Sequence, residues 1–312
     1  AEFDIENDCY VIDTRTLENN THYALEVTVD GETYQSEYQP LLTSPEIDEV
    51  TWQETESSVS IYVTTLAEED DPRHFMWAFD EDWEFHAEVD MRGNDEIKPI
   101  YVKEHYPDLT EAHNPYLFCW MHDVSRHINL HSSSNLSENL VKNVKIHEIS
   151  IEDIRISYIY SILVKQWSLS DEAYHYFSTM KQYTEEDESL FAPILSDLQG
   201  NISCISNPNK RAHGYVLASN VTTKRLFIYE EDFKHMRSLY TEPFCIAKGT
   251  DPMWVGEPAG PTELWLSPWV IMAPNGDRYN PDAILYTWSC ADCRHTVGAT
   301  KKRPDFWPND HE

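Results

Sequence analysis

Alternation of apolar and polar residues is the feature of this sequence that most restricts its fold. Between positions 75 and 85, five aromatic residues share one side of a two-residue repeat: Phe75, Trp77, Phe79, Trp83 and Phe85. Polar and charged residues dominate the other side. A period of two is typical of a β-strand that buries one face, so the sequence predicts a long strand here.

The longest alternation predicts an eleven-residue strand over 154–164. Its apolar side is formed by Ile154, Ile156, Tyr158, Tyr160, Ile162 and Val164. A strand of this length is typical of the centre of a sandwich or barrel. Further strands are predicted at 58–63, 215–218 and 224–229.

A β-hairpin is predicted near the start of the chain. Residues 22–29 alternate, Gly31 permits a turn, and residues 33–35 follow as the returning strand. We expect the apolar side of this hairpin to be buried, and that side is Tyr23, Leu25, Val27 and Val29. The prolines between 40 and 45 then indicate a linker. This pattern predicts a first unit over 1–42 and a main domain over 46–312.

One helix is predicted, over about 170–184. Ser170 is a favourable N-cap, and Asp171 and Glu172 suit the positive end of the helix dipole. The apolar stripe that would pack on a sheet is Ala173, Phe177 and Met180. Seven prolines between 243 and 281 predict long surface loops. The expected fold is mainly β: a β-sandwich-like domain with one packed α-helix and long Pro/Trp-rich loops.

Acidic residues outnumber basic residues by 55 to 23, which gives a formal net charge of −32. A surface this negative repels nucleic-acid phosphates, and it disfavours direct docking on anionic membranes. Cations, cationic peptides and neutral sugars remain open as ligands. No segment approaches the roughly 18 to 20 apolar residues that a membrane-spanning helix needs.

Six cysteines suit an oxidising, extracytoplasmic compartment. Cys290 and Cys293 form a Cys-x-x-Cys motif near the end of the chain. A structural zinc site would need two more Cys or His ligands at similar spacing, and a redox site would need the pair at a helix N-terminus. Neither pattern is present. We therefore expect disulfide bonding, either within the pair or with Cys245.

Carboxylates are densest in two places. The first is Glu68, Glu69, Asp70 and Asp71, between two predicted strands. Oxygen atoms that converge from a loop of this kind could bind Ca²⁺. The second is Asp80, Asp82 and Glu84, on one face of the 75–85 strand. A surface glycan hydrolase would need two such acids in a cleft and is a less favoured hypothesis, because a solvated acidic face also explains both clusters.

The chain contains no complete catalytic signature. His-Glu-x-x-His and Gly-x-Ser-x-Gly are absent, and nine glycines are few for phosphate-binding loops. We therefore expect a protein that is not an enzyme. The best candidates for surface contact with a ligand are three tryptophans of the Pro-rich loops, Trp254, Trp265 and Trp269.

Several blocks of the sequence resemble one known family. The main block runs from Tyr160 to Tyr174, and others lie at 189–208 and 214–228. The last block joins the Cys-x-x-Cys motif to Pro304-Asp-Phe-Trp307. In this order they resemble a Bacteroidota lipoprotein family of unknown function, domain of unknown function 4249. The resemblance covers most of the chain, from about Tyr23 to its end.

This resemblance implies a lipid-anchored protein on the extracellular face of the outer membrane, often encoded beside a TonB-dependent receptor. Residues 1–42 would be the C-terminal part of an immunoglobulin-like β-domain, and the earlier strands and the lipid anchor would precede the sequence given. A second bridge, between Cys119 and Cys204, is also implied, because both fall in family blocks. The family brings no catalytic residues.

The function that we expect is therefore non-catalytic. The protein would assist an outer-membrane β-barrel receptor in capturing or admitting a substrate. A structural or adhesive component of the cell envelope is the alternative.

Overall fold

The computed structural model describes residues 2–4, 9–12, 14, 17–18, 21–87, 89–92, 97–100, 106, 108–110, 113–185, 198–234, 247–249, 269–274 and 284–308. Over these ranges the protein is mainly β, as predicted, and its strands pair in antiparallel sheets. The predicted helix is confirmed as α1 (Asp171–Glu185). None of the described helices has both the length and the apolar character that a membrane span requires.

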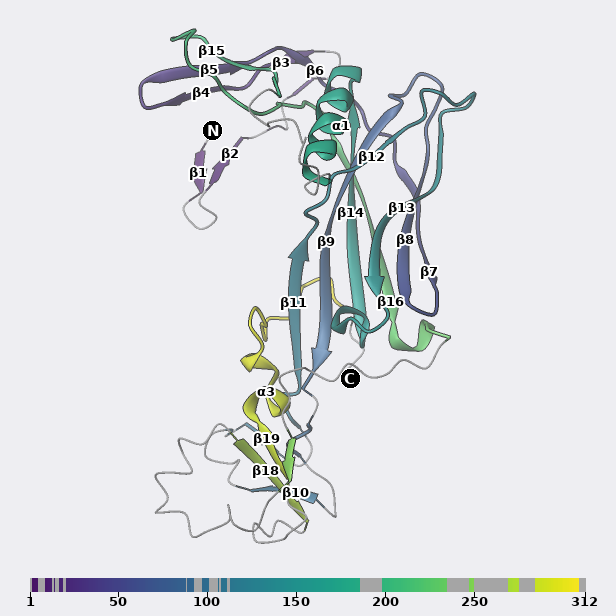
Figure 1. The fold of residues 1–312 in the computed structure, drawn as a ribbon, viewed down its shortest axis with the longest axis vertical. Coiled ribbons are helices and arrows are strands. Elements are labelled where there is room, and N and C mark those ends of the chain that lie inside the picture. The colour runs from purple at the N-terminus through teal and green to yellow at the C-terminus, as the bar shows by residue number, and fades with distance from the viewer. Residues whose placement is uncertain are drawn as a thin grey trace.

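A five-stranded antiparallel sheet forms the centre of the molecule (Figure 1). Its strands are β9 (His74–His86), β11 (Phe118–Val124), β12 (Asn129–Ser132), β14 (Ile159–Leu169) and β16 (Val221–Tyr229). Strand β9 pairs with β14 along one edge, while β11 and β12 share its other edge. The strands predicted at 75–85 and 224–229 are confirmed, each with a longer span.

The strand predicted over 154–164 is displaced along the chain. Residues Ile154–Ile156 form the short 3₁₀ turn η1, and β14 begins only at Ile159. The side chain of Asp153 accepts a hydrogen bond from the backbone N–H of Arg155, which caps this turn and interrupts the extended backbone. The side of the strand that was predicted to face inward is nevertheless correct within β14. Three of the predicted residues have no exposed surface: Tyr160, Ile162 and Val164.

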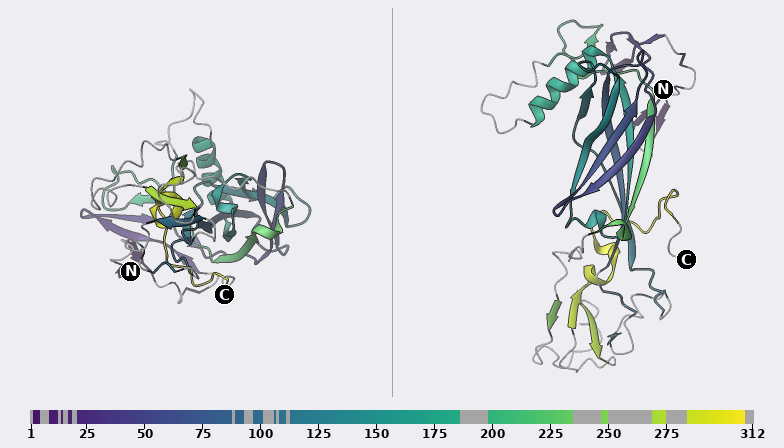
Figure 2. Two further views of the ribbon diagram at one scale, coloured as in Figure 1. Left: turned by 90° about the horizontal axis from the view of Figure 1, so that it is seen from below. Right: turned by 90° about the vertical axis from the view of Figure 1, so that its right-hand side faces the viewer.

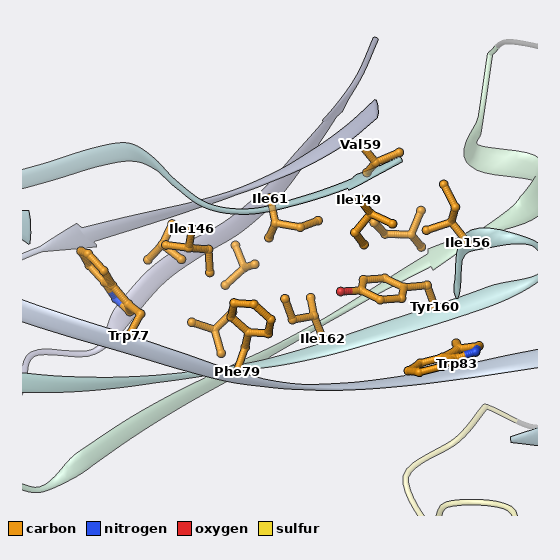
Figure 3. Close-up of a cluster of buried hydrophobic side chains, with 14 of the residues drawn as sticks. Val59, Ile61, Trp77, Phe79, Trp83, Ile146, Ile149, Ile156, Tyr160 and Ile162 are labelled. Atoms are coloured by element: carbon orange, nitrogen blue, oxygen red, sulfur yellow. The ribbon is translucent and has the colours of Figure 1, made fainter. Parts of the chain in front are cut away.

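A second sheet packs face to face on the first and completes the sandwich (Figure 2). Its strands are β7 (Ile47–Glu54), β8 (Ser58–Leu66) and β13 (Leu140–Ser150). The predicted inward residues of β8 are fully buried: Val59, Ile61 and Val63. Figure 3 shows Ile61 and Ile149 from this sheet opposite Phe79 and Ile162 from the first. Alternation therefore predicts both inner faces of the core.

Short strands form the N-terminal part of the chain. They are β1 (Glu2–Asp4), β2 (Cys9–Val11), β3 (His22–Tyr23), β4 (Glu26–Val29), β5 (Glu32–Ser36) and β6 (Gln39–Pro40), and β5 also pairs with β15 (Ile202–Cys204). The predicted hairpin is confirmed as β4–β5, with left-handed backbone at Asp30 and Gly31. Its apolar side is not buried as predicted: Val27 and Val29 are 43% and 52% exposed, because β4 is an edge strand outside the sandwich core.

The segment predicted as a linker is anchored. The hydroxyl of Ser44 accepts a hydrogen bond from the backbone N–H of Ser168 at 2.6 Å, and the carbonyl of Pro45 accepts one from the side chain of Gln166 at 2.8 Å. These contacts attach the chain to the end of β14. The division at 42–46 itself stays a prediction.

A small sheet lies at the end of the molecule opposite α1 (Figures 1 and 2). It contains β10 (Ile97–Ile100), β17 (Ala247–Gly249), β18 (Trp269–Pro274) and β19 (Ile284–Thr287), and α3 (Trp288–Ala291) and the 3₁₀ turn η4 (Cys293–His295) follow. Strands β17 and β18 fall within the segment predicted as loops, and residues 250–268 and 275–283 of that segment lie outside the described residues.

Candidate functional site

A groove of about 660 Å³ runs along one face of α1. The helix contributes a stripe of residues three or four positions apart: Glu172, His175, Tyr176, Thr179 and Tyr183. Ala173, on an adjacent face of the helix, is fully buried. The N-cap hydroxyl of Ser170 accepts a hydrogen bond from the N–H of Ala173 at 3.2 Å and starts the helix at the mouth of the groove.

The opposite wall consists of Glu37, residues 198–201 and Tyr215. Asn201 builds this wall: its side-chain amide donates to the carbonyl of Val216 at 2.9 Å, and its oxygen accepts from the N–H of Val216 at 2.8 Å. These bonds replace the sheet partners that the predicted strand at 215–218 would need, so that prediction is wrong. Gly200 is required here, because an added Cβ would lie 1.7 Å from the carbonyl oxygen of Gly214.

Aromatic rings join the two walls. The rings of Tyr176 and Tyr215 have centroids 5.1 Å apart, and Phe177 lies 6.0 Å from Tyr215. Burial raises the pKa of Tyr176. Burial also raises the pKa of Tyr215; a hydrogen bond from Ser170 opposes this shift, and the negative charges of Glu172 and Glu37 add to it. Both hydroxyls therefore remain neutral at physiological pH.

The mouth of the groove touches a Ser, His and Asp arrangement. The Nε2 atom of His74 lies 2.9 Å from Asp171 Oδ1 and 3.3 Å from Ser134 Oγ. A catalytic triad needs these partners on different ring nitrogens, whereas both contacts here fall on Nε2. The buried Nδ1 of His74 has no hydrogen-bond partner among the described residues. The arrangement attaches α1 to β9 and to the turn that follows β12, and it lacks the relay geometry of a triad.

The carboxylates predicted for a hydrolase are each held by a different partner on the outer face of the central sheet. Asp80 lies 2.7 Å from Lys165, and Asp82 lies 3.2 Å from Arg225. Glu84 is fully buried, 2.7 Å from His86, and it accepts a hydrogen bond from the indole of Trp307 at 3.2 Å. These contacts stabilise the sheet and its covering tail, and Glu84 has no access to a substrate in this arrangement.

The predicted Ca²⁺ loop is closed by its own hydrogen bonds. Asp71 accepts one from the backbone N–H of Glu68 at 2.7 Å, and Asn139 donates to the carbonyl groups of both residues. Glu69 and Asp70 are exposed at the turn between. Nowhere in the described ranges do three or more His, Cys, Asp or Glu side chains come together in a way that could hold a metal ion. The loop is shaped by its own backbone and by Asn139.

The disulfide prediction needs correction in its pairing. Cys119 is bonded to Cys293, so the bridges predicted between Cys119 and Cys204 and within the Cys-x-x-Cys pair are both wrong. Strand β11 brings Cys119 against η4, while Cys204 lies free and buried in β15. Cys290 is also disulfide-bonded. The predicted partner Cys245 lies outside the described residues.

The predicted tryptophan surface is not tested. Trp254 and Trp265 lie outside the described residues, and Trp269 is described only as the first backbone position of β18. The groove was not foreseen, although the stripe of tyrosine, histidine and glutamate on the polar face of the predicted helix was a signal for it.

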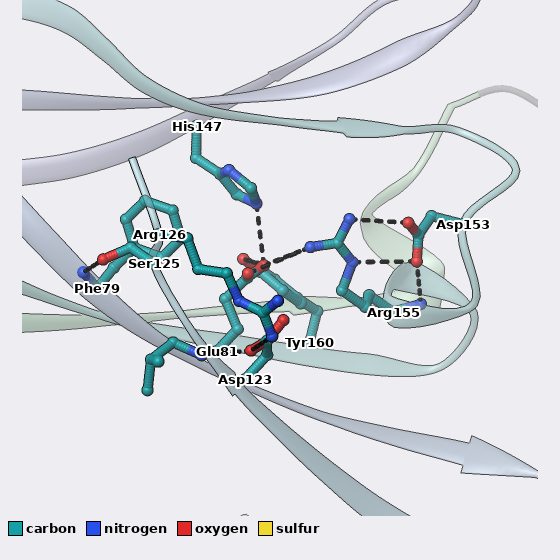
Figure 4. Close-up of polar contacts among 10 residues, drawn as sticks. Phe79, Glu81, Asp123, Ser125, Arg126, His147, Asp153, Arg155 and Tyr160 are labelled. Atoms are coloured by element: carbon teal, nitrogen blue, oxygen red, sulfur yellow. Dashed lines mark hydrogen bonds and ion pairs between the residues drawn. The ribbon is translucent and has the colours of Figure 1, made fainter. Parts of the chain in front are cut away.

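A buried ionic network lies inside the sandwich, away from the groove (Figure 4). Glu81 is 3% exposed and accepts hydrogen bonds from Tyr160 at 2.6 Å and from Arg155 at 3.2 Å. His147 lies 3.0 Å from the same carboxylate, and Asp153 holds Arg155 from the other side. Burial would raise the pKa of Glu81, but the hydrogen bond and charge of His147, the hydrogen bond from Tyr160 and the charge of Arg155 hold it below its usual value.

The C-terminal segment covers the outer face of the central sheet. Trp120 and Thr300 exchange backbone hydrogen bonds at 2.9 Å, and Trp307 is only 4% exposed, in a cluster with Trp120 and Ile159. Arg225 stacks over the ring of Phe306, 3.5 Å from its centroid. The tail that follows Cys293 is thus held by the disulfide to Cys119 and by the packing of Trp307.

A family model for a domain of unknown function, DUF4249, matches residues 2–225. The chain belongs to the DUF4249 family. Every residue that lines the groove lies within the matched part, whereas Cys293 and Trp307 lie beyond it. No curated protein and no solved structure matches the chain. The groove is thus a feature of the DUF4249 segment itself.

Proposed function

We propose that this DUF4249 protein is a non-catalytic, lipid-anchored protein on the extracellular face of the outer membrane in Bacteroidota. There it would assist a TonB-dependent receptor in capturing or admitting a substrate. The groove along α1 is the observation that carries the proposal. Its volume falls in the range of small-ligand sites, and its walls combine tyrosine rings with convergent polar groups.

The rigidity of the walls supports a binding role. α1 is capped at the groove mouth and tied to β9 through His74, while Asn201 and Gly200 fix the facing segment. A site built on fixed elements loses little conformational entropy when a ligand binds.

The test is purification of the native, full-length protein from outer membranes in mild detergent. Co-purification of a β-barrel receptor is the expected result. Recovery as a free monomer would contradict the proposal, and recovery as a filament would support the structural alternative instead.

A further inference from the structure

The groove along α1 is lined by negative charge that the described residues do not neutralise. Glu37 lies on one wall, Asp171 and Glu172 lie on the other, and no lysine or arginine is among the lining residues. Among the described residues, neither Glu37 nor Glu172 forms an ion pair, and the side chain of Asp171 pairs only with His74. The electrostatic potential of the groove is therefore negative, and an anionic ligand would be repelled.

Aromatic rings share the same space as these charges. Tyr176 and Tyr183 rise from α1, and Tyr215 faces them from the other wall. A cation over a tyrosine face is attracted by the ring quadrupole, and nearby carboxylates strengthen the attraction. A neutral ligand such as a sugar could stack on the rings, but it would displace water from Glu37 and Glu172 without compensating their charge.

We propose that this groove binds aliphatic ammonium groups carried on an extended chain, as in a polyamine or a lysine-bearing peptide segment. The inference rests on the binding role proposed above and names the ligand class. The ammonium group would lie between the carboxylates, and the methylene chain would lie along the tyrosine rings. The open form of the groove suits a chain that extends beyond it.

Isothermal titration of the purified protein at low salt tests the proposal. Spermidine and acetyl-trilysine amide are the ammonium probes, and maltotriose and triglutamate are the neutral and anionic ones. We expect at least one ammonium probe to bind, with an affinity that falls as salt rises. Tighter binding of spermidine would identify the ligand as a free amine, and tighter binding of acetyl-trilysine amide would identify it as a peptide. Binding of maltotriose alone, or of no probe, would overturn the proposal.

Three variants locate the binding. Glu172→Gln and Tyr183→Leu should each raise the dissociation constant of the ammonium probe about two- to fivefold. This is the range of a surface ion pair and of an exposed cation–π contact. Glu231→Gln removes an exposed charge from the turn η3 (Glu230–Asp232) and should change nothing. That turn follows the end of β16 that pairs with Ile159, so it lies the whole length of β14, about 33 Å, from the start of α1.

Equal losses in all three variants would indicate attraction to the acidic surface in general and would overturn the proposal. The titration and the co-purification fail separately. If the protein binds ammonium probes but no receptor co-purifies with it, the ligand proposed for the groove stands and the receptor role is contradicted.

Discussion

At the scale of the residue, Arg155 compensates a negative charge buried inside the sandwich. Its guanidinium group contacts both Glu81 and Asp153. We expect Arg155→Met to lower the free energy of unfolding by about 3 kcal/mol, because removing one partner leaves a buried carboxylate undercompensated. Arg126→Met is the matched control, since Arg126 pairs with Asp123 but is 80% exposed. This variant should lower the free energy of unfolding by less than about 1 kcal/mol. Urea unfolding measures both, and equal losses would contradict the role of the network.

The same network shows how far sequence reasoning reaches for single residues. Alternation correctly places Phe79 and Trp83 in the core, and Glu81 has the same parity between them. A charged residue on the buried side of a strand needs a polar or charged partner in the interior, so the position of Glu81 already indicated such a partner. The identity of that partner was not available, because Arg155 reaches Glu81 only through the 3₁₀ turn that displaces β14.

At the scale of the element, the bridge between Cys119 and Cys293 joins β11 to η4 across 174 positions of the chain. We expect the double variant Cys119→Ser/Cys293→Ser to lower the free energy of unfolding by about 3 to 5 kcal/mol, since so long a loop restricts the unfolded chain strongly. Cys204→Ser is the control, because Cys204 is buried but free. This variant should lower the free energy of unfolding by about 1 kcal/mol. Thermal unfolding under non-reducing conditions separates the two, and similar losses would contradict the stabilising role of the bridge.

Elements that depend on local pattern were predictable, and those that depend on distant contacts were not. The helix over about 170–184 was predictable because its cap, its acidic first turn and its apolar stripe are adjacent in sequence. The groove was not, because its second wall comes from Glu37, residues 198–201 and Tyr215, which the fold alone brings together. Cysteine pairing failed for the same reason.

At the scale of the whole molecule, two electrostatic effects oppose each other as pH changes. The net charge of −32 makes the folded chain repel itself at neutral and alkaline pH. Hydrogen bonds from Ser206, Lys210 and Asn207 lower the pKa of Glu32 to about 2. The pKa of Glu81 is also lowered. A folded pKa below the unfolded value contributes stability above the unfolded pKa, and this stability is lost as pH falls through the folded pKa.

The melting temperature should therefore pass through a maximum on the acidic side of neutrality. At low salt it should be higher at about pH 5.5 than at about pH 8, because fewer carboxylates repel one another, and it should fall below about pH 4 as paired carboxylates gain protons. Added salt should raise the melting temperature more at the higher pH, since screening removes the repulsion. Glu81→Gln should lower the melting temperature near neutral pH, because it leaves Arg155 and His147 without their buried partner. It should also flatten the acidic decline, because it removes one group with a lowered pKa. Scanning calorimetry across pH measures both branches; a decline identical to that of the unsubstituted protein would show that Glu81 titrates alike in the folded and unfolded chain.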